Sequence, residues 1–293
     1  MKILICGGHG QLGQDVGSLL DADHEVMSCG SRQLDISNTS QVASIFSNYQ
    51  PDIVINCAAY TAVDKCETET QLAWQVNATG PENLARQAEE TGARLIHIST
   101  DYVFDGKKTA TESYSEDEDV APLSEYGRSK LAGEQAIEAY SSNYLILRTA
   151  WLYGWKGKNF LKTILRLALA DPTRELKVVN DQYGSLTWTA TLARQIQAVL
   201  SPEMQGIVHA TATGSSTWYE GACYFLDTMR LPYRITPCTT AEYPTPAHRP
   251  ANSILNNQRL ENEGLSVFRG WQEDIEQFVA LFKEELIREA LQG

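Results

Sequence analysis

The chain has 293 residues, of which 43% are hydrophobic and 21% are charged, and 24 Lys and Arg against 37 Asp and Glu give a net charge of −13. A chain of this length and composition folds as one large globular domain or two joined ones, which excludes a disordered or fibrous protein. The acidic balance disfavours a nucleic-acid partner, although a few placed Arg or Lys side chains can still bind an anionic small molecule.

The sequence also carries no membrane or secretory signal. It has no run of about 18 apolar residues that would span a membrane, and its apolar N-terminal stretch is too short for the core of a signal peptide. The six cysteines form no C-x-x-C pair and have no regular spacing. Such cysteines are typical of reduced thiols rather than of a disulfide framework or a zinc site, so we expect a cytoplasmic protein without a metal.

Short runs rich in Ile and Val alternate with helical patterns in the first half of the chain, which is typical of β-α-β units wound around a parallel sheet. The predicted strands are residues 2–6, 25–28, 53–57, 94–99 and 144–148. The predicted helices are residues 11–20, a segment capped by Thr39 or Ser40, residues 70–90 with a break or bend at Pro81, and residues 126–140. Residues 105–125 form a polar segment, and its acidic run, residues 116–119, is predicted to be a solvated loop.

The pattern is weaker after Arg148. We predict helices at residues 160–170, 189–200 and 271–291, and strands at residues 176–179 and 207–210. Residues 232–254 contain five prolines and little periodicity, which indicates an ordered loop over a site rather than a linker. Trp155, Trp188 and Trp218 are predicted to be packing residues.

A glycine-rich turn follows the first predicted strand. Gly8, Gly10 and Gly13 fit the pattern G-x-G-x-x-G, and Gly7, Gly10 and Gly13 fit G-x-x-G-x-x-G. Glycine is needed where φ is positive and where the bare backbone must approach a pyrophosphate, and the following helix points its free N–H groups at that anion. Because the motif lies between a predicted strand and a predicted helix, it predicts a dinucleotide site.

The end of the second predicted strand bears on which dinucleotide is bound. A carboxylate there would hold the ribose hydroxyls of NAD, whereas a basic residue would accept the 2′-phosphate of NADP. No carboxylate stands at this strand end, and Ser31 and Arg32 follow. This favours NADPH, with NADH as the alternative if Arg32 is only a surface residue. Asp35 and Ile36 are expected to line the adenine.

Tyr126 and Lys130 stand four residues apart on one face of a predicted helix. A phenol has a reference pKa of about 10, and we expect the neighbouring ammonium group to lower it. Such a Tyr can protonate a carbonyl oxygen while hydride arrives at the carbon. Thr100 follows the fourth predicted strand, where ligands bind in open α/β sheets, so it can hydrogen-bond the same carbonyl.

These features resemble the extended short-chain dehydrogenase/reductases and, more narrowly, the dTDP-4-dehydrorhamnose reductase family. The narrower resemblance rests on blocks that cover most of the chain: residues 56–64 (NCAAYTAVD), 99–104 (STDYVF), 126–134 (YGRSKLAGE), 148–154 (RTAWLYG), 180–184 (NDQYG) and 244–250 (PTPAHRP). The resemblance implies an α/β Rossmann-type doubly wound parallel sheet with a smaller, discontinuous C-terminal substrate domain. Residues 1–155 and 178–212 would form the NADP(H)-binding domain, and residues 156–177 and 213–293 the nucleotide-sugar domain.

The resemblance also implies an activity, the reduction of the C4 ketone of dTDP-4-dehydro-β-L-rhamnose by NADPH. Thr100, Tyr126 and Lys130 would be the catalytic residues, and Lys130 would also bond the nicotinamide ribose. The cofactor would further contact Gly7, Gly10, Gln11, Leu12, Gly13, Ala59, Tyr60, Thr61 and Ser99. The sugar would contact Asp101, Tyr102 and Trp151, and the guanidinium group of Arg249 would bind the nucleotide diphosphate.

Several alternatives stay open at this point. A reductase or epimerase of a related nucleotide-linked deoxysugar would share the catalytic residues. A non-catalytic regulatory subunit, such as the partner of methionine adenosyltransferase, would bind the dinucleotide without turnover, but the intact Thr100, Tyr126 and Lys130 argue against it. Asn77 is expected either to be solvated or to support Lys130. No spacing of carboxylates specifies a metal site, and both a monomer and a homodimer are compatible with the sequence.

Overall fold

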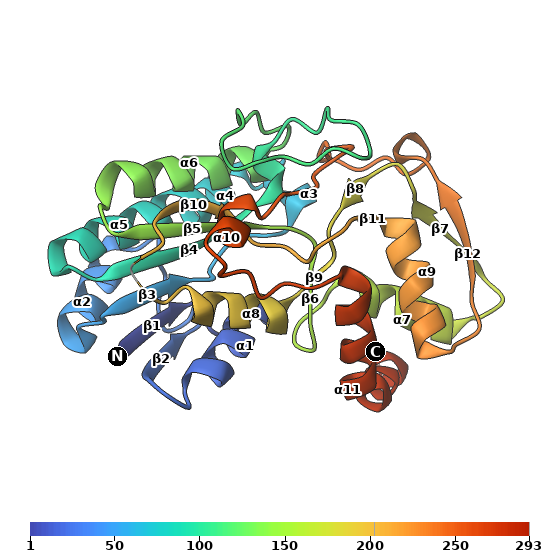
Figure 1. The fold of residues 1–293 in the computed structure, drawn as a ribbon, viewed down its shortest axis with the longest axis horizontal. Coiled ribbons are helices and arrows are strands. Elements are labelled where there is room, and N and C mark those ends of the chain that lie inside the picture. The colour runs from blue at the N-terminus through green and yellow to red at the C-terminus, as the bar shows by residue number, and fades with distance from the viewer. Residues whose placement is uncertain (202, 293) are drawn as a thin grey trace.

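The computed structural model describes residues 1–201 and 203–292. Its centre is a six-stranded sheet in the order β10-β5-β4-β3-β1-β2, and all neighbouring strands are parallel (Figure 1). The strands are β1 (Lys2–Cys6), β2 (Glu25–Cys29), β3 (Ile53–Asn56), β4 (Arg94–Thr100), β5 (Tyr144–Thr149) and β10 (Gly206–His209). The strand order reverses between β1 and β3, and ligands of open α/β sheets bind beside such a reversal, beyond the carboxyl ends of the strands.

Helices cover both faces of this sheet. Ile3 and Ile5 of β1 pack on the side of α1 (Gln11–Leu20) and α8 (Thr189–Ala198). Leu4 of the same strand packs on the opposite side, with α2 (Thr39–Tyr49), α5 (Gly80–Thr91) and α6 (Glu125–Tyr140) (Figure 1). The strands are apolar on both faces, which explains their nearly continuous hydrophobic runs. The predicted Rossmann-type α/β fold is confirmed, and we call this part of the molecule the sheet lobe.

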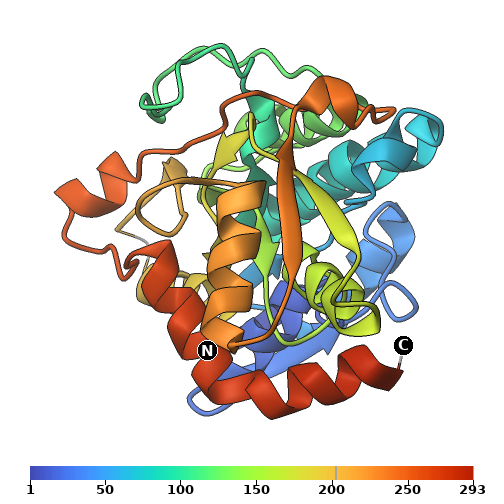
Figure 2. The same ribbon diagram turned by 90° about the vertical axis from the view of Figure 1, so that its right-hand side faces the viewer.

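A second group of elements packs around its own core beside the sheet lobe (Figures 1 and 2). This second lobe contains the parallel strands β7 (Glu175–Val179) and β12 (Arg234–Cys238) and the helices α7 (Phe160–Ala170), α9 (Trp218–Met229) and α11 (Trp271–Gln292). Short strand pairs lie where the lobes meet: β6 (Leu152–Tyr153) with β9 (Thr187–Trp188), and β8 (Tyr183–Gly184) with β11 (Ser216–Thr217). Of the helices in the described ranges, none has the length and apolar character that crossing a membrane requires.

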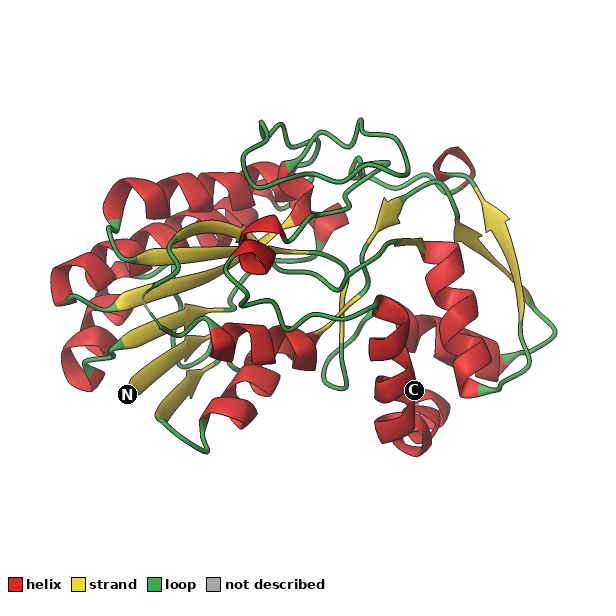
Figure 3. Ribbon diagram, viewed as in Figure 1, coloured by secondary structure: helices red, strands yellow, loops and turns green. Residues whose placement is uncertain are grey.

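The helix predicted over residues 70–90 contains an irregular segment. It consists of α4 (Thr70–Trp74), a π-helical segment η1 (Gln75–Thr79) and α5, and the residues at both junctions keep helical φ and ψ. α5 belongs to the helices that cover one face of the sheet (Figure 3). The predicted break or bend is therefore a π-helical segment that ends just before Pro81, which stands in the first turn of α5. A short helix, α3 (Val63–Cys66), precedes this group.

Two further local predictions are wrong. The N-cap of α2 is Asn38, whose side chain accepts the N–H of Gln41, rather than Thr39 or Ser40. Residues 232–254 were predicted to be a loop, but they contain the strand β12 and the 3-10 turn η3 (Thr240–Glu242). Pro237 is tolerated in β12 because the strand belongs to a two-stranded sheet, so it has an edge where no N–H has to pair. A further short helix, α10 (Gln258–Asn262), follows this segment.

Candidate active site

Two cavities adjoin at the carboxyl ends of the parallel strands, of about 740 Å³ and about 450 Å³, and both are lined by Gly10, Cys57 and Ala59. The smaller one brings together seven predicted cofactor residues: Gly7, Gly10, Ser31, Asp35, Ile36, Ala59 and Tyr60. The larger one brings together the other half of the predicted site: Gly10, Gln11, Leu12, Ala59, Thr61, Ser99, Thr100, Asp101, Tyr102, Tyr126, Lys130, Trp151 and Arg249. A dinucleotide can thus run from one cavity into the other, beside the strand reversal.

The glycine turn has the shape that a pyrophosphate needs. Gly7 has a φ of +73°, and a Cβ there would lie 2.6 Å from the backbone nitrogen of Ala58. Gly13 lines neither cavity, and a Cβ on it would lie 2.3 Å from the carbonyl oxygen of Gly7, so it allows α1 to pack against the turn. The first turn of α1 contains no acidic residue, and its N-cap Gly10 has no side chain to bond the free N–H groups. These groups can therefore receive an anion, and the residues fit a bound dinucleotide.

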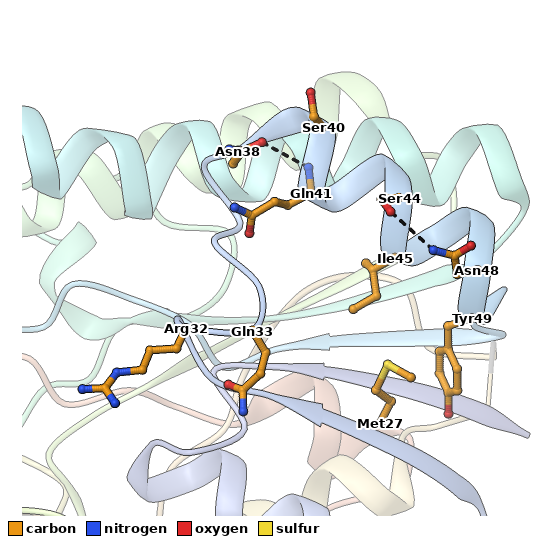
Figure 4. A pocket seen from close by; sticks show the side chains of 10 residues that line it. All are labelled: Met27, Arg32, Gln33, Asn38, Ser40, Gln41, Ser44, Ile45, Asn48 and Tyr49. Atoms are coloured by element: carbon orange, nitrogen blue, oxygen red, sulfur yellow. Dashed lines mark hydrogen bonds between the residues drawn. The ribbon is translucent and has the colours of Figure 1, made fainter.

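Arg32 does not line this crevice. It is exposed and lines a separate open pocket of about 780 Å³ between the end of β2 and α2. Figure 4 shows Arg32 and Gln33 at one end of that pocket, with Asn48 and Tyr49 at the other. Ser31 and Arg32 were both predicted to lie near a 2′-phosphate, and of these two only Ser31 lines the smaller cavity. The role of Arg32 therefore stays a prediction.

Thr100 and Tyr126 are held at one point by two local motifs. Thr100 ends β4, and its hydroxyl accepts the N–H of Tyr102 at 3.2 Å and donates to Oδ1 of Asp101 at 3.0 Å. Tyr126 stands in the first turn of α6, the helix whose N-cap is Ser124. Gly127 lets this turn approach β4 closely, because a Cβ there would lie 2.3 Å from the carbonyl oxygen of Tyr102. Tyr102 itself meets the Tyr126 ring edge-on, with the centroids 5.5 Å apart.

Burial raises the pKa of Tyr126, and the negative charge of Asp101 raises it further. A hydrogen bond with Thr100 acts in the opposite direction but does not cancel these effects. The prediction that Lys130 lowers this pKa is therefore wrong for the arrangement in this structure. The Nζ atom of Lys130 donates to the carbonyl oxygen of Ile98 at 2.7 Å and lies 3.1 Å from Nε2 of His97. Burial also lowers the pKa of Lys130 to about 8, which weakens the cationic character on which the prediction relied.

Asp101 is the buried carboxyl group of the site, with 2% of its surface exposed. Burial raises its pKa to about 6, although hydrogen bonds with Ser253 and Thr100 act in the opposite direction. Its second oxygen, Oδ2, is buried and has no hydrogen-bond donor at bonding distance among the described residues. A carboxyl group in this state titrates close to neutral pH, directly beside Tyr126.

An aromatic pair forms the wall toward the second lobe. Trp151 has a φ of 47° and stacks on Trp218 with the ring centroids 3.6 Å apart and the planes 10° from parallel. Gly184 makes room for the Trp151 ring, since a Cβ there would lie 2.4 Å from it. The prediction that Trp218 is only a packing residue is wrong, because its side chain lines the large cavity. No local sequence signal marks this role, since the two rings come from distant segments.

Arg249 lies where the large cavity meets a pocket of about 640 Å³ in the second lobe; Phe160, Trp218 and Arg249 line both. Its guanidinium group forms a two-pronged ion pair with Asp64, at 3.0 Å and 2.9 Å. The hydrogen bond from Arg249 lowers the pKa of Asp64, so this carboxylate is ionised at neutral pH. Asp64 therefore fixes the guanidinium at the junction of the two cavities.

Asn77 is fully buried in η1, so it is not solvated. It accepts the N–H of Tyr60 at 2.8 Å and donates to the Tyr60 carbonyl at 3.1 Å and to the Ser129 hydroxyl at 3.1 Å. It thus joins the chain after β3 to α6, and its partners do not include Lys130. Within residues 1–201 and 203–292, no group of three or more His, Cys, Asp or Glu side chains has the arrangement of a metal site.

The sequence analysis gave no role to His97, nor to Asn56 beyond its place at the start of the block of residues 56–64. Both are fully buried and lie behind Lys130, with Asn56 Nδ2 3.0 Å from His97 Nδ1. His97 stands within the apolar strand β4 and Asn56 ends β3, so the available signal was a polar residue within or at the end of a hydrophobic run.

Comparison with known proteins assigns the family. A family model described as the RmlD substrate binding domain matches residues 1–284. The dTDP-4-dehydrorhamnose reductase of Escherichia coli is 40% identical over 291 residues, which covers 93% of this chain and 95% of the relative. A probable dTDP-4,6-dihydroxy-2-methyloxan-3-one 4-ketoreductase of Streptomyces antibioticus is 41% identical and covers 92% of each chain. The crystal structure of the Bacillus anthracis dTDP-4-dehydrorhamnose reductase in complex with NADP superimposes with a TM-score of 0.92 at 37% identity, over 95% of this chain and 98% of that one. The chain therefore belongs to the dTDP-4-dehydrorhamnose reductase (RmlD) family.

Proposed function

We propose that the protein reduces the C4 ketone of dTDP-4-dehydro-β-L-rhamnose to dTDP-β-L-rhamnose with NADPH. The observation that carries this proposal is that Thr100, Tyr126 and Lys130 line one cavity that continues into the glycine-turn crevice. Family membership supports the choice of substrate. The product would serve as a rhamnose donor for cell-surface polysaccharide.

In this proposal the chain holds the dinucleotide and delivers a proton. Bound NADPH supplies the hydride to C4. Tyr126 keeps its proton at neutral pH because its pKa is raised, so its hydroxyl can donate that proton to the oxygen formed at C4. Thr100 would hydrogen-bond the same oxygen once its O–H turns away from Asp101, and it fixes the hydroxyl of Tyr126. Lys130 would bond the nicotinamide ribose through its Nζ atom, which donates to the Ile98 carbonyl in this structure.

The nucleotide part of the substrate would lie toward the second lobe, which the proposed sugar domain of residues 156–177 and 213–293 largely forms. Asp101, Tyr102 and Trp151 would contact the sugar, and Arg249 would bind the diphosphate from the position that Asp64 fixes. We place the enzyme in the cytoplasm, as a monomer or homodimer. Its free cysteines support this placement.

The test is a coupled assay that starts from dTDP-glucose with the upstream dehydratase and epimerase. We expect NADPH oxidation that depends on this protein, with a product whose NMR couplings identify dTDP-β-L-rhamnose. The same assay without the epimerase is the control for substrate choice. NADPH binding without oxidation would support a regulatory subunit instead, and a product with the other configuration at C4 would support a different deoxysugar reductase.

A further inference from the structure

His97 is a buried imidazole that the proposed mechanism does not use. It lies in the middle of β4 with no exposed surface, between Asn56 on the neighbouring strand β3 and Lys130 on α6. Its Nδ1 atom is 3.0 Å from Nδ2 of Asn56, and its Nε2 atom is 3.1 Å from Nζ of Lys130. Both ring nitrogens therefore have one polar neighbour each.

The amide of Asn56 determines which ring nitrogen carries the proton. The backbone N–H of Ala58 donates to Oδ1 of Asn56 at 3.0 Å, so the amide nitrogen is the atom that faces His97. An amide N–H can donate to Nδ1 only if that nitrogen has a free lone pair. Burial, followed by the charge of Lys130, lowers the pKa of His97 well below its usual value, so the ring is neutral and its single proton is on Nε2.

This tautomer opposes a charged Lys130. The Nε2–H group points at Nζ and needs a lone pair there, which a neutral amine has and an ammonium group lacks. A charged Lys130 could donate to Nε2 only if the ring proton moved to Nδ1, where it would meet the N–H of Asn56. The arrangement of Asn56 and His97 thus favours the neutral amine form of Lys130. The hydrogen bond from Nζ of Lys130 to the Ile98 carbonyl can form in the neutral and in the charged state.

The other groups around Lys130 shift its pKa through burial or through their charge. Burial lowers its pKa, whereas Glu134 on the same helix and Cys57 at the end of β3 raise it. Glu134 is itself paired with Arg148 of β5 at 2.7 Å. His97 is the neighbour whose effect depends on a hydrogen position rather than on a net charge.

We infer that His97, held in one tautomer by Asn56, is a positioning residue that controls the protonation of Lys130. The inference deepens the proposed function, on which it rests for the catalytic use of Lys130. It assigns to the pair a role in setting the pH range in which Lys130 is an ammonium group that can donate to the nicotinamide ribose.

The first test needs no substitution. Nitrogen-15 NMR of the full-length protein distinguishes a protonated from an unprotonated ring nitrogen in each histidine, and His97→Gln identifies the resonances of His97. We expect Nε2 to carry the proton and Nδ1 to be bare. A proton on Nδ1 would overturn the inference, because Nε2 would then be an acceptor for the ammonium group.

The second test follows the Lys130 side chain by carbon-13 labelling of the lysine ε-carbons, with Lys130→Arg to identify its signal. We expect the His97→Gln variant to raise the Lys130 titration midpoint by at least about one unit, or tenfold in its protonation equilibrium, because the Gln carbonyl is free to accept from the ammonium group. His209→Gln is the matched control, since His209 is equally buried but lies against the Asn256 carbonyl. An unchanged midpoint in the His97 variant would refute the inference.

Asn56→Asp approaches the same question from the other side of the ring. One carboxylate oxygen can still accept the Ala58 N–H, and the other would draw the ring proton to Nδ1, which the nitrogen-15 spectrum of this variant reports independently of the added charge. In the reductase assay, the alkaline limb of kcat/KM should move to higher pH in the His97 variant while KM for the sugar stays constant. If no variant or wild-type protein oxidises NADPH with the sugar, the proposed function fails, but the tautomer and the titration still decide this inference.

Discussion

At the scale of single residues, Tyr126 is defined by burial more than by its neighbours. Burial and Asp101 keep its hydroxyl protonated, so the proton is available when a carbonyl is reduced. Tyr126→Phe removes the hydroxyl and keeps the ring that packs edge-on against Tyr102. We expect turnover to fall by about 10²–10⁴-fold, with almost no change in NADPH affinity. Steady-state rates and titration of NADPH fluorescence measure the two effects, and a variant with near-normal turnover would remove Tyr126 from the mechanism.

Asp101 gives the stability of the protein a characteristic pH dependence. Its pKa is raised to about 6 in the folded state, from a reference value of 3.8, so between these values the folded protein binds more protons than the unfolded chain and loses stability as pH rises. Asp101→Asn keeps an acceptor for the Thr100 hydroxyl and removes the charge. We expect this variant to lack the loss, which amounts to about 3 kcal/mol above pH 6. Urea unfolding at pH 4 and pH 7 measures it, and parallel curves for the two proteins would contradict the assignment.

The sequence predicted which residues meet at the site better than it predicted their protonation. The spacing of Tyr126 and Lys130 placed both on one helix face, and the structure keeps them in one cavity. The direction of the Tyr126 pKa was wrong because it depends on burial and on Asp101 from another element. His97 was missed for the same physical reason, since its partners come from β3 and α6 and no local pattern brings them together.

At the scale of elements, the π-helical segment η1 carries Asn77, whose side chain bonds the N–H and the carbonyl of Tyr60. Asn77→Ala leaves the N–H and the carbonyl of Tyr60 without their buried partner, so we expect a loss of about 2–3 kcal/mol of unfolding free energy. The segment after β3 lines the cofactor crevice through Ala59 and Tyr60, so KM for NADPH should rise as well. Ser129→Ala is the control, because it removes one of the three hydrogen bonds of Asn77 and leaves both Tyr60 groups paired. Equal losses in the two variants would contradict this account.

The elements that were predicted best are those whose burial is uniform. The parallel strands are apolar on both faces, and their runs stand out from the sequence. The π-helical segment was not predictable, because Pro81 marks only that some break is near and the hydrogen bonds of Asn77 decide where it falls. β12 was missed because an edge strand tolerates proline, so a proline-rich segment does not exclude a strand.

At the scale of the whole molecule, the large cavity is built from both lobes. The sheet lobe contributes the catalytic residues, and the second lobe contributes Phe160 and Trp218. The resemblance predicted this division of labour, but not that Trp218 of α9 would stack on Trp151. Contacts between lobes depend on how two folded units meet, and periodicity within either unit carries no information about them.

The stacked pair leads to a prediction about the coupling of the lobes. Trp218→Leu removes the ring on which Trp151 rests, and Trp151 is held in a left-handed backbone conformation that needs such support. We expect KM for the nucleotide sugar to rise about 2–10-fold, which corresponds to the 0.5–1.5 kcal/mol of an aromatic pair, while NADPH affinity stays constant because no part of Trp218 lines the glycine-turn cavity. Trp155→Leu is the matched control, since Trp155 is also half-buried and stacked, on Phe282, but does not line the large cavity. Substrate and cofactor titrations of both variants measure the effect, and a change in NADPH affinity alone would mean that Trp218 supports the sheet lobe rather than the substrate.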